Sequence, residues 1–215
     1  MKILVSGFDP FNGEKINPSI EAVKRLPDTI EGCEIIKVEI PTIIDESVNK
    51  LERYIEIYRP DVVLNIGQAG GRSDITVERA GINIDDFNIE DNAGNRIIDE
   101  KIVKDGSDAY FTTVPLKAIV EALRINKIPA SVSNSAGTFV CNHVCYSMCY
   151  LAKKKYPAMR TGFIHIPYIP EQVIDKRGTP SMSLDNIVEG LRISIEAIIA
   201  NKKDIVFSDG FDCWL

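Results

Sequence analysis

Histidine and long apolar segments are scarce in this chain. Its 215 residues include two histidines, five cysteines and one tryptophan, so any reaction that needs an imidazole must use His143 or His165. The apolar run at the N-terminus breaks at Gly7 and Asp9, which makes it too short for a signal-peptide core or a membrane-spanning helix. We therefore expect a cytoplasmic protein with no membrane partner.

Positive charge is also in short supply. The 25 Lys and Arg residues are outnumbered by 31 Asp and Glu residues, which gives a formal net charge of -6. Proteins that follow a phosphate backbone gather basic side chains on one face, so we expect no nucleic-acid partner. A hydrophobic content of 45% with 26% charged residues is typical of a globular chain with one well-buried core.

The cysteines do not have the pattern of a disulfide framework. Their number is odd and their positions, 33, 141, 145, 149 and 213, are irregular. Disulfide scaffolds are usually short secreted chains with an even number of cysteines. We therefore expect reduced thiols, in agreement with a cytoplasmic location.

Apolar strands that alternate with amphipathic helices define the expected fold. Continuous apolar runs such as 61–66 are typical of strands buried on both faces, and helical periodicity recurs between them. The sequence predicts strands near 3–5, 33–40, 61–66, 75–77, 130–134 and 161–166, and helices near 18–25, 42–59 (capped by Thr42), 115–126, 138–156 and 184–201. This order predicts an α/β fold in one domain over 1–215, a three-layer α/β/α sandwich with a largely parallel, twisted sheet.

Two segments fall outside this alternation. Residues 67–106 begin with a glycine-rich turn and continue through a long polar stretch with an Asn-Ala-Gly-Asn turn, which predicts an extended excursion or hairpin over one end of the sheet. Loops of this length are usually functional. Residues from about 204 to 215 form a C-terminal tail, and Phe207, Phe211 and Trp214 favour its docking on this chain or on a neighbouring subunit.

Cys141 is the candidate nucleophile. It lies in the opening turns of a predicted helix that follows a strand and a tight Ala-Gly turn. The helix dipole and unpaired N–H groups there can lower the pKa of a thiol below its usual value of about 8.5. Cys141, Cys145 and Cys149 also recur at the spacing of a buried helical stripe. We assign Cys145 and Cys149 to packing, and both roles stay open for Cys141.

Geometry argues against a metal site in the same segment. The Cys-x-His-x-Cys pattern contains suitable ligands, but residue 143 lies about 200° around a helix from residue 141. No Cys-x-x-Cys pair is present to chelate a tetrahedral metal. We expect no metal and no other cofactor, and the same geometry argues against His143 as the base for Cys141.

His165 and Glu78 complete a candidate triad. His165 is near the carboxyl end of a predicted strand, an edge of the sheet that it would share with the helix N-terminus that carries Cys141. The alternative is a buried structural histidine. Glu78 is the candidate carboxylate that orients the imidazole. Its alternative is a strand carboxylate paired with Arg72 or Arg79.

Three segments resemble one family. GFDPFNG at 7–13, GQAGGRSDITVERAGIN at 67–83 and SNSAGTFVCNHVCY at 133–146, together with His165 in FIHIP, are similar to the pyroglutamyl peptidase I (pyrrolidone-carboxylate peptidase) family of cysteine peptidases. The resemblance covers nearly the whole chain. It implies a cysteine exopeptidase that removes an N-terminal pyroglutamyl (5-oxoprolyl) residue from peptides through a thioester acyl-enzyme, in an assembly that is often a homotetramer.

The resemblance also implies roles for single residues. Cys141 would be the nucleophile, His165 the general acid and base, and Glu78 the carboxylate that orients His165. Five further residues would bind substrate: Phe8, Phe11, Asn17, Gln68 and Phe139. The rings of Phe8 and Phe11 would hold the flat, neutral lactam. Core packing is the alternative for these two rings, and a helix N-cap is the alternative for Asn17.

One position departs from the family pattern. Where the family usually reads D-A-R-I-P-D-N, this chain reads D-F-N-I-E-D-N, so Asn88 replaces an arginine near the catalytic site. If that arginine stabilises an oxyanion, its loss lowers the rate about 10²-fold unless Arg72, Arg79 or Arg96 substitutes. Two alternatives therefore stay open: a catalytically weakened family member, and a phosphorylase-like small-molecule binder whose glycine-rich loop at 67–72 cradles an anion. The glycine spacing fits neither a Rossmann nor a P-loop pattern.

Overall fold

A computed structural model describes residues 1–206 of the chain. The strands are β1 (Lys2–Phe8), β2 (Thr29–Ile30), β3 (Cys33–Ile40), β4 (Val62–Gln68), β5 (Ile75–Glu78), β6 (Ala80–Ile82), β7 (Ala109–Phe111), β8 (Ala130–Ser133) and β9 (Arg160–Ile166). The helices are α1 (Pro18–Arg25), α2 (Glu46–Tyr58), α3 (Leu116–Ile125), α4 (Val140–Lys154) and α5 (Leu184–Ala200), with a short 3-10 turn, η1 (Pro170–Gln172).

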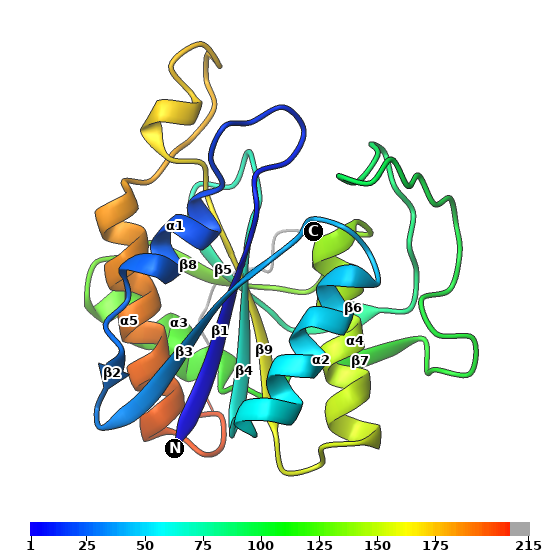
Figure 1. Ribbon diagram of the computed structural model, residues 1–215. Coiled ribbons are helices and arrows are strands. Elements are labelled where there is room, and N and C mark those ends of the chain that lie inside the picture. Colours follow the sequence, from blue (N-terminus) through cyan, green and yellow to red (C-terminus); the bar gives the residue numbers. More distant parts are fainter. Residues whose placement is uncertain (207–215) are drawn as a thin grey trace.

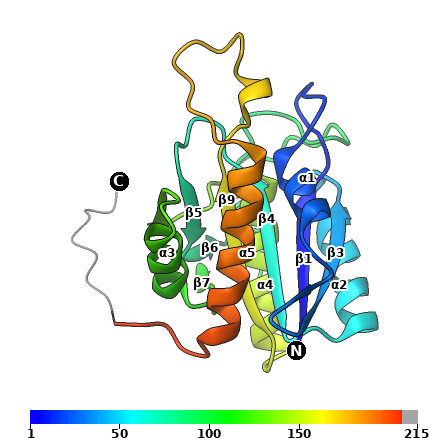
Figure 2. The same ribbon diagram turned by 90° about the vertical axis from the view of Figure 1, so that its left-hand side faces the viewer.

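A seven-stranded sheet lies between two layers of helices, as Figures 1 and 2 show. Its strand order is β2-β3-β1-β4-β9-β5-β8. Helices α1, α3 and α5 cover one face, and α2 and α4 cover the other. Within residues 1–206, only β2 against β3 and β5 against β9 pair antiparallel in this sheet. The predicted three-layer α/β sandwich with a largely parallel sheet is therefore confirmed.

The central strands are apolar because both of their faces are covered. Every residue of β4 is buried, and so is every residue of β9 after Arg160. The sheet consequently has a hydrophobic core on each side, one beneath α1, α3 and α5 and one beneath α2 and α4. None of the helices within residues 1–206 combines the length and the apolar character that crossing a membrane requires.

Two details of the secondary structure differ from the expectation. Helix α2 begins at Glu46 with Asp45 at its N-cap, so the prediction that Thr42 caps it was wrong. Thr42 is buried and is already bonded to the loop after β1, since its N–H donates to Asp9 Oδ1 (2.6 Å) and its hydroxyl donates to the Asp9 carbonyl (3.2 Å). The strands β2, β6 and β7 were not predicted, because two or three residues carry too little alternation to be recognised.

The polar excursion after β6 is a hairpin-like segment, as expected. Asp85 and Glu100 form an antiparallel bridge, and the Phe87 N–H donates to the Ile97 carbonyl (2.7 Å). At the tip, Asn92 Nδ2 donates to Asp9 Oδ1 (3.2 Å) and to the Pro10 carbonyl (2.9 Å). The excursion therefore joins the loop after β1 at the carboxyl edge of the sheet (Figure 1). The predicted docking of the tail through Phe207, Phe211 and Trp214 lies outside the described residues.

Candidate active site

The N-terminus of α4 carries Cys141 in its first turn. Phe139 is the N-cap residue and provides no side-chain cap, and the first bond into the helix runs from the His143 N–H to the Phe139 carbonyl (3.1 Å). The N–H groups of residues 140–142 therefore have no partner within the helix. Such groups, together with the positive end of the helix dipole, form a site for a negatively charged oxygen.

His165 and Glu78 form a buried hydrogen-bonded pair on the sheet face beneath α4. His165 Nδ1 lies 2.7 Å from Glu78 Oε1, and the two side chains are 4% and 0% exposed. Burial opposes ionisation of Glu78, but the hydrogen bond and charge of His165 and the charge of Arg72 outweigh it and hold the pKa of Glu78 below its usual range. An ionised carboxylate only accepts hydrogen bonds, so Nδ1 carries the proton and Nε2 is left as the basic nitrogen.

Arg72 contacts the same carboxylate. Its Nη1 lies 2.6 Å from Glu78 Oε1 and also donates to the hydroxyl of Thr76. Arg79, the other candidate partner of Glu78, donates instead to Asn134 Oδ1 (2.9 Å). The glycine-rich turn thus presents its arginine to Glu78, whereas an anion cradle would need that arginine free to hold a ligand.

Gly67 brings the Cys141 sulfur to this pair. Gly67 on β4 is the register partner of His165 on β9, and adjacent strands are about 4.8 Å apart. A Cβ atom at Gly67 would lie 2.9 Å from Cys141 Sγ and 2.9 Å from two ring carbons of Phe163. The sulfur therefore lies against bare backbone directly beside His165. Cys141, His165 and Glu78 come together although they are far apart in the sequence.

The resting state of the Cys141 thiol differs from the expectation. Burial, followed by the nearby Glu78 carboxylate, raises the pKa of Cys141 to about 12, and Arg72 opposes this rise. The prediction that the helix N-terminus lowers this pKa was wrong, because burial and a neighbouring negative charge both disfavour the thiolate. The thiol is protonated at neutral pH and needs a base to become a nucleophile.

His143 does not point to Cys141. Its Nδ1 lies 2.8 Å from Asp85 Oδ2 and its Nε2 lies 3.8 Å from Asp45 Oδ1, so it links α4 to the excursion and to the start of α2. The other two helix cysteines are buried, and Cys149 Sγ lies 3.4 Å from the Thr161 hydroxyl. These contacts agree with the predicted packing roles of Cys145 and Cys149.

The candidate substrate phenylalanines separate into two groups. Phe8 is 2% exposed and packs in the core, with its ring centroid 6.3 Å from that of Phe163. Phe11 and Phe139 are half-buried, and their ring centroids lie 6.3 Å apart. The Phe139 ring also meets that of Phe87 in the excursion edge-on, with 4.6 Å between the centroids. Phe11 therefore pairs with Phe139, the residue that precedes α4, and not with Phe8.

The two polar candidates are held by other protein groups. Asn17 Oδ1 accepts from the Ser19 N–H (3.1 Å) and hydroxyl (2.8 Å), and its Nδ2 donates to the Asp9 carbonyl (2.9 Å). Asn17 is thus the N-cap of α1, its alternative role, and it fixes the loop that carries Phe11. Gln68, the last residue of β4, accepts through Oε1 from Gln172 Nε2 (2.8 Å).

Asn88 and Arg96 lie on the exposed surface of the excursion. Asn88 is exposed and follows the buried Phe87, so it is one residue from the ring that contacts Phe139. Arg96 is exposed on the return side of the excursion, and Arg79 is directed to Asn134. Of the three arginines named as substitutes, Arg72 is the one that reaches the triad.

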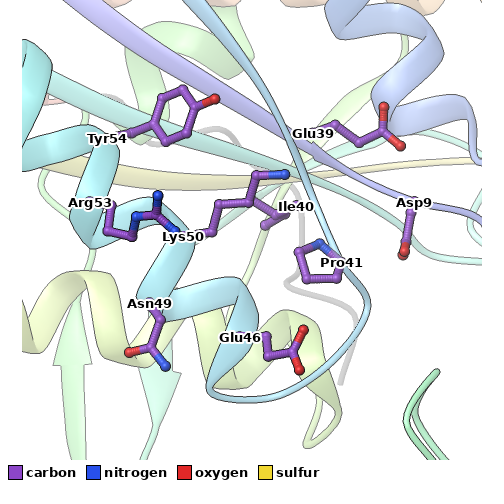
Figure 3. Close-up of a pocket in the computed structure, with 9 residues that line it drawn as sticks. All are labelled: Asp9, Glu39, Ile40, Pro41, Glu46, Asn49, Lys50, Arg53 and Tyr54. Atoms are coloured by element: carbon purple, nitrogen blue, oxygen red, sulfur yellow. The ribbon is translucent and has the colours of Figure 1, made fainter.

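A hollow of about 680 Å³ opens elsewhere, between the end of β3 and α2 (Figure 3). Its lining residues are Asp9, Glu39, Ile40, Pro41, Glu46, Asn49, Lys50, Arg53 and Tyr54. Cys141, His165 and Glu78 do not line it. The chemistry is therefore assigned to the edge beside α4 and not to this hollow.

Two residues of the site were not identified from the sequence. The sequence places Gly67 at the start of the glycine-rich turn, whereas the structure includes it in β4, and a glycine within a strand often marks a close approach by another group. That signal was available but did not identify the Cys141 sulfur as the group. Phe163, which packs 4.8 Å from the His165 ring, gave no signal because an apolar residue in a buried strand is ordinary.

The fold and the site define a class of protein: an α/β sandwich whose helix N-terminus presents a thiol beside a His–Glu pair, as in hydrolases that use cysteine. The family model of pyroglutamyl peptidase matches residues 1–201. A pyrrolidone-carboxylate peptidase from Finegoldia magna is 61% identical to this chain, with 98% of this chain and 99% of the relative covered. One from Treponema denticola is 59% identical, with 99% of this chain and 100% of the relative covered.

Solved structures agree with these relatives. Pyroglutamyl peptidase I from Bacillus amyloliquefaciens superposes with a TM-score of 0.94 at 45% identity, covering 96% of this chain and 99% of its own. A mutant pyrrolidone carboxyl peptidase from Pyrococcus furiosus superposes with a TM-score of 0.90 at 41% identity, covering 93% of this chain and 99% of its own. This chain belongs to the pyroglutamyl peptidase family.

Proposed function

We propose that this protein is a cysteine exopeptidase that removes an N-terminal pyroglutamyl residue from peptides, with Cys141, His165 and Glu78 as its catalytic residues. Family membership supports the substrate and the enzyme class. The observation that carries the residue assignment is the buried His165–Glu78 hydrogen bond of 2.7 Å beside the first turn of the helix that holds Cys141.

Attack by the thiol requires His165 as a general base. As Cys141 Sγ bonds to the carbonyl carbon of the pyroglutamyl residue, its proton passes to His165 Nε2, and the carbonyl oxygen takes the negative charge. The N–H groups at the start of α4 are oriented to receive that oxygen. Because the pKa of Cys141 is about 12 at rest, proton transfer accompanies attack and no thiolate needs to form beforehand.

The same histidine then acts as an acid. The tetrahedral intermediate collapses as the C–N bond breaks, and the departing amine takes the proton from His165. A thioester to Cys141 remains, and water that is deprotonated by His165 hydrolyses it to release pyroglutamate. Glu78 keeps Nδ1 protonated and stabilises the imidazolium that forms in each half of the reaction.

Recognition of the lactam falls to the aromatic residues before α4. Phe11 and Phe139 offer half-buried ring faces to a flat, uncharged ring, and an ionised glutamate would have to lose its hydration there. Phe8 lies in the core against Phe163, Asn17 holds the loop that carries Phe11, and Gln68 offers an amide at the end of β4. No cofactor takes part in these steps.

Hydrolysis of a fluorogenic pyroglutamyl amide tests the proposal. Cys141→Ala should remove activity, whereas Cys149→Ala, two turns further along the same helix, should keep it within a few fold. Rapid acid quenching followed by mass spectrometry should find the pyroglutamyl group on the peptide that contains Cys141. No turnover by the wild type, or activity that survives Cys141→Ala, would reject the proposal.

We further infer a cytoplasmic homotetramer that binds neither membranes nor nucleic acid. Phe111 and Ile125 are 71% and 73% exposed, and an assembly would cover apolar side chains of this kind. Light scattering after size-exclusion chromatography measures the mass of the particle directly. A monomer of 23.9 kDa at micromolar concentration would contradict the assembly.

A further inference from the structure

We propose that Arg72 is a positioning residue of this enzyme: its guanidinium fixes the Glu78 carboxylate and supplies that buried carboxylate with a permanent counter-charge. The inference rests on the proposed function and adds a residue to its machinery. His165 and Arg72 share one oxygen atom of the Glu78 carboxylate.

Glu78 Oε1 accepts from both sides. His165 Nδ1 lies 2.7 Å away and Arg72 Nη1 lies 2.6 Å away. The other carboxylate oxygen, Oε2, is buried and has no hydrogen-bond partner among residues 1–206. These two bonds to a single atom, with the Ser133 side chain as a weaker third contact, orient the carboxylate and through it the imidazole.

A buried carboxylate also needs a permanent counter-charge. Glu78 is 0% exposed, and an ionised group in that position is costly unless it is paired. His165 is neutral when it acts as the base for Cys141, so it cannot supply the charge at that moment. Arg72 can, because a guanidinium does not lose its proton in proteins.

Arg72 is anchored so that it keeps this position. The guanidinium donates to the Thr76 hydroxyl on β5 and, through Nη2, reaches the Ser135 carbonyl (3.5 Å). Ser135 precedes the turn into α4. One side chain thus contacts the strand of Glu78 and the segment that leads to Cys141.

The charge of Arg72 also affects the proton equilibrium of the site. The titratable groups that face His165 are Glu78 on β5, Arg72 in the preceding turn and Cys141 on α4, and β4 contributes only the uncharged Gly67. The guanidinium 2.6 Å from the carboxylate is within the roughly 4–6 Å over which an opposite charge favours the charged form. Arg72 therefore helps to hold the pKa of Glu78 low, and it also lowers the pKa of Cys141 relative to a site without it. The ionised carboxylate stabilises the imidazolium that forms, and the lower pKa of the thiol makes its proton easier to remove.

The test compares Arg72→Gln and Arg72→Lys with Arg79→Gln as a matched control. Arg79 is next to Glu78 in the sequence but bonds to Asn134. In Arg72→Gln the acid limb of the kcat/KM profile should move up by about one pH unit, because the pKa of Glu78 rises when its cationic partner is lost. Arg72→Lys should keep the limb near its wild-type position with a lower kcat, since charge is retained and the planar fork is lost. Arg79→Gln should match the wild type.

Alkylation of Cys141, followed by mass spectrometry of its peptide, is a readout that does not need turnover. Arg72→Gln should slow it about tenfold at a given alkaline pH, because the thiolate fraction falls with a rise of about one unit in pKa. A wild type that fails to hydrolyse the substrate rejects the proposed function, yet the alkylation comparison still tests Arg72. The inference is overturned if folded Arg72→Gln has a lower rate but an unmoved acid limb and wild-type alkylation of Cys141. Should the glutamine variant unfold, Arg72→Lys takes its place in this comparison.

Discussion

Replacing Gly67 by alanine should inactivate the enzyme without unfolding it. The new Cβ would lie 2.9 Å from Cys141 Sγ and 2.9 Å from two carbons of the Phe163 ring, whereas ordinary van der Waals contact begins at 3.4 Å. Phe163 cannot yield, because it is fully buried and its ring packs against Phe8 and His165. The half-buried cysteine side chain is the group that can rotate or shift.

The expected sizes follow from this overlap. Overpacking of a core typically costs about 1–3 kcal/mol, which for a chain of this length is a fall in Tm of about 2–4 °C per kcal/mol. A displaced nucleophile is more damaging to catalysis, since a shift of about 1 Å can lower the rate about 10²-fold. We therefore expect kcat to fall about 10²-fold with a moderate loss of stability and little change in KM.

Gly162→Ala on β9 is the matched control. Its Cβ would lie 2.6 Å from a methyl group of Val114, on the side of the sheet away from Cys141. It should lower Tm by a similar amount and leave kcat within a few fold. Steady-state kinetics on the fluorogenic amide and differential scanning calorimetry measure both quantities. A Gly67→Ala enzyme with wild-type kcat, or a Gly162→Ala enzyme with an equally low kcat, would refute the reasoning.

Three further changes address other parts of the site. Glu78→Gln should lower kcat by about 10²–10⁴-fold in the same assay, because an amide can stabilise the wrong tautomer of His165. Folding lowers the pKa of Glu78, so its ionised form stabilises the folded state at pH values above the unfolded pKa of 4.5. This stabilisation is lost as the pH falls through the lower folded pKa. Below pH 4.5 the Tm of the wild type should therefore fall more steeply than that of Glu78→Gln. Asp91 accepts hydrogen bonds from the N–H groups of residues 44, 93 and 95 and so ties the tip of the excursion to the loop after β3. Asp91→Ala should therefore raise KM more than it lowers kcat. An unchanged KM would contradict this. Asn88→Arg should raise kcat by up to about 10²-fold if an arginine at this exposed position stabilises the oxyanion, and an unchanged or lower value would show that it is dispensable here.

Much of the fold was predictable because its signals are local. Pro18 after Asn17 marks the start of α1, and the apolar run that ends at Gln68 marks a strand covered on both faces. The start of α2 was misplaced, because Thr42 has the chemistry of an N-cap but is bonded to Asp9 from another loop. Sequence pattern cannot reveal a competing partner that is 33 residues away.

The candidate site was predictable in identity but not in electrostatics. Helix geometry separates His143 from Cys141, and the edge rule for parallel strands selects His165. The sign of the Cys141 pKa shift depends on how deeply the sulfur is buried and on where the Glu78 charge lies. Both are properties of the packed structure. The choice of Arg72 over Arg79 as the partner of Glu78 is likewise decided by the glycine turn and not by sequence proximity.

The protonated resting thiol has a consequence for how long the enzyme survives. Peroxides and alkylating agents attack thiolates, and the first oxidation product of a cysteine is a sulfenic acid. A thiol whose pKa is about 12 exposes almost no thiolate until His165 takes its proton during attack on a bound substrate. The nucleophile is thus chemically quiet between turnovers, and compounds that resemble the acyl group should inactivate it far faster than simple thiol reagents of equal intrinsic reactivity.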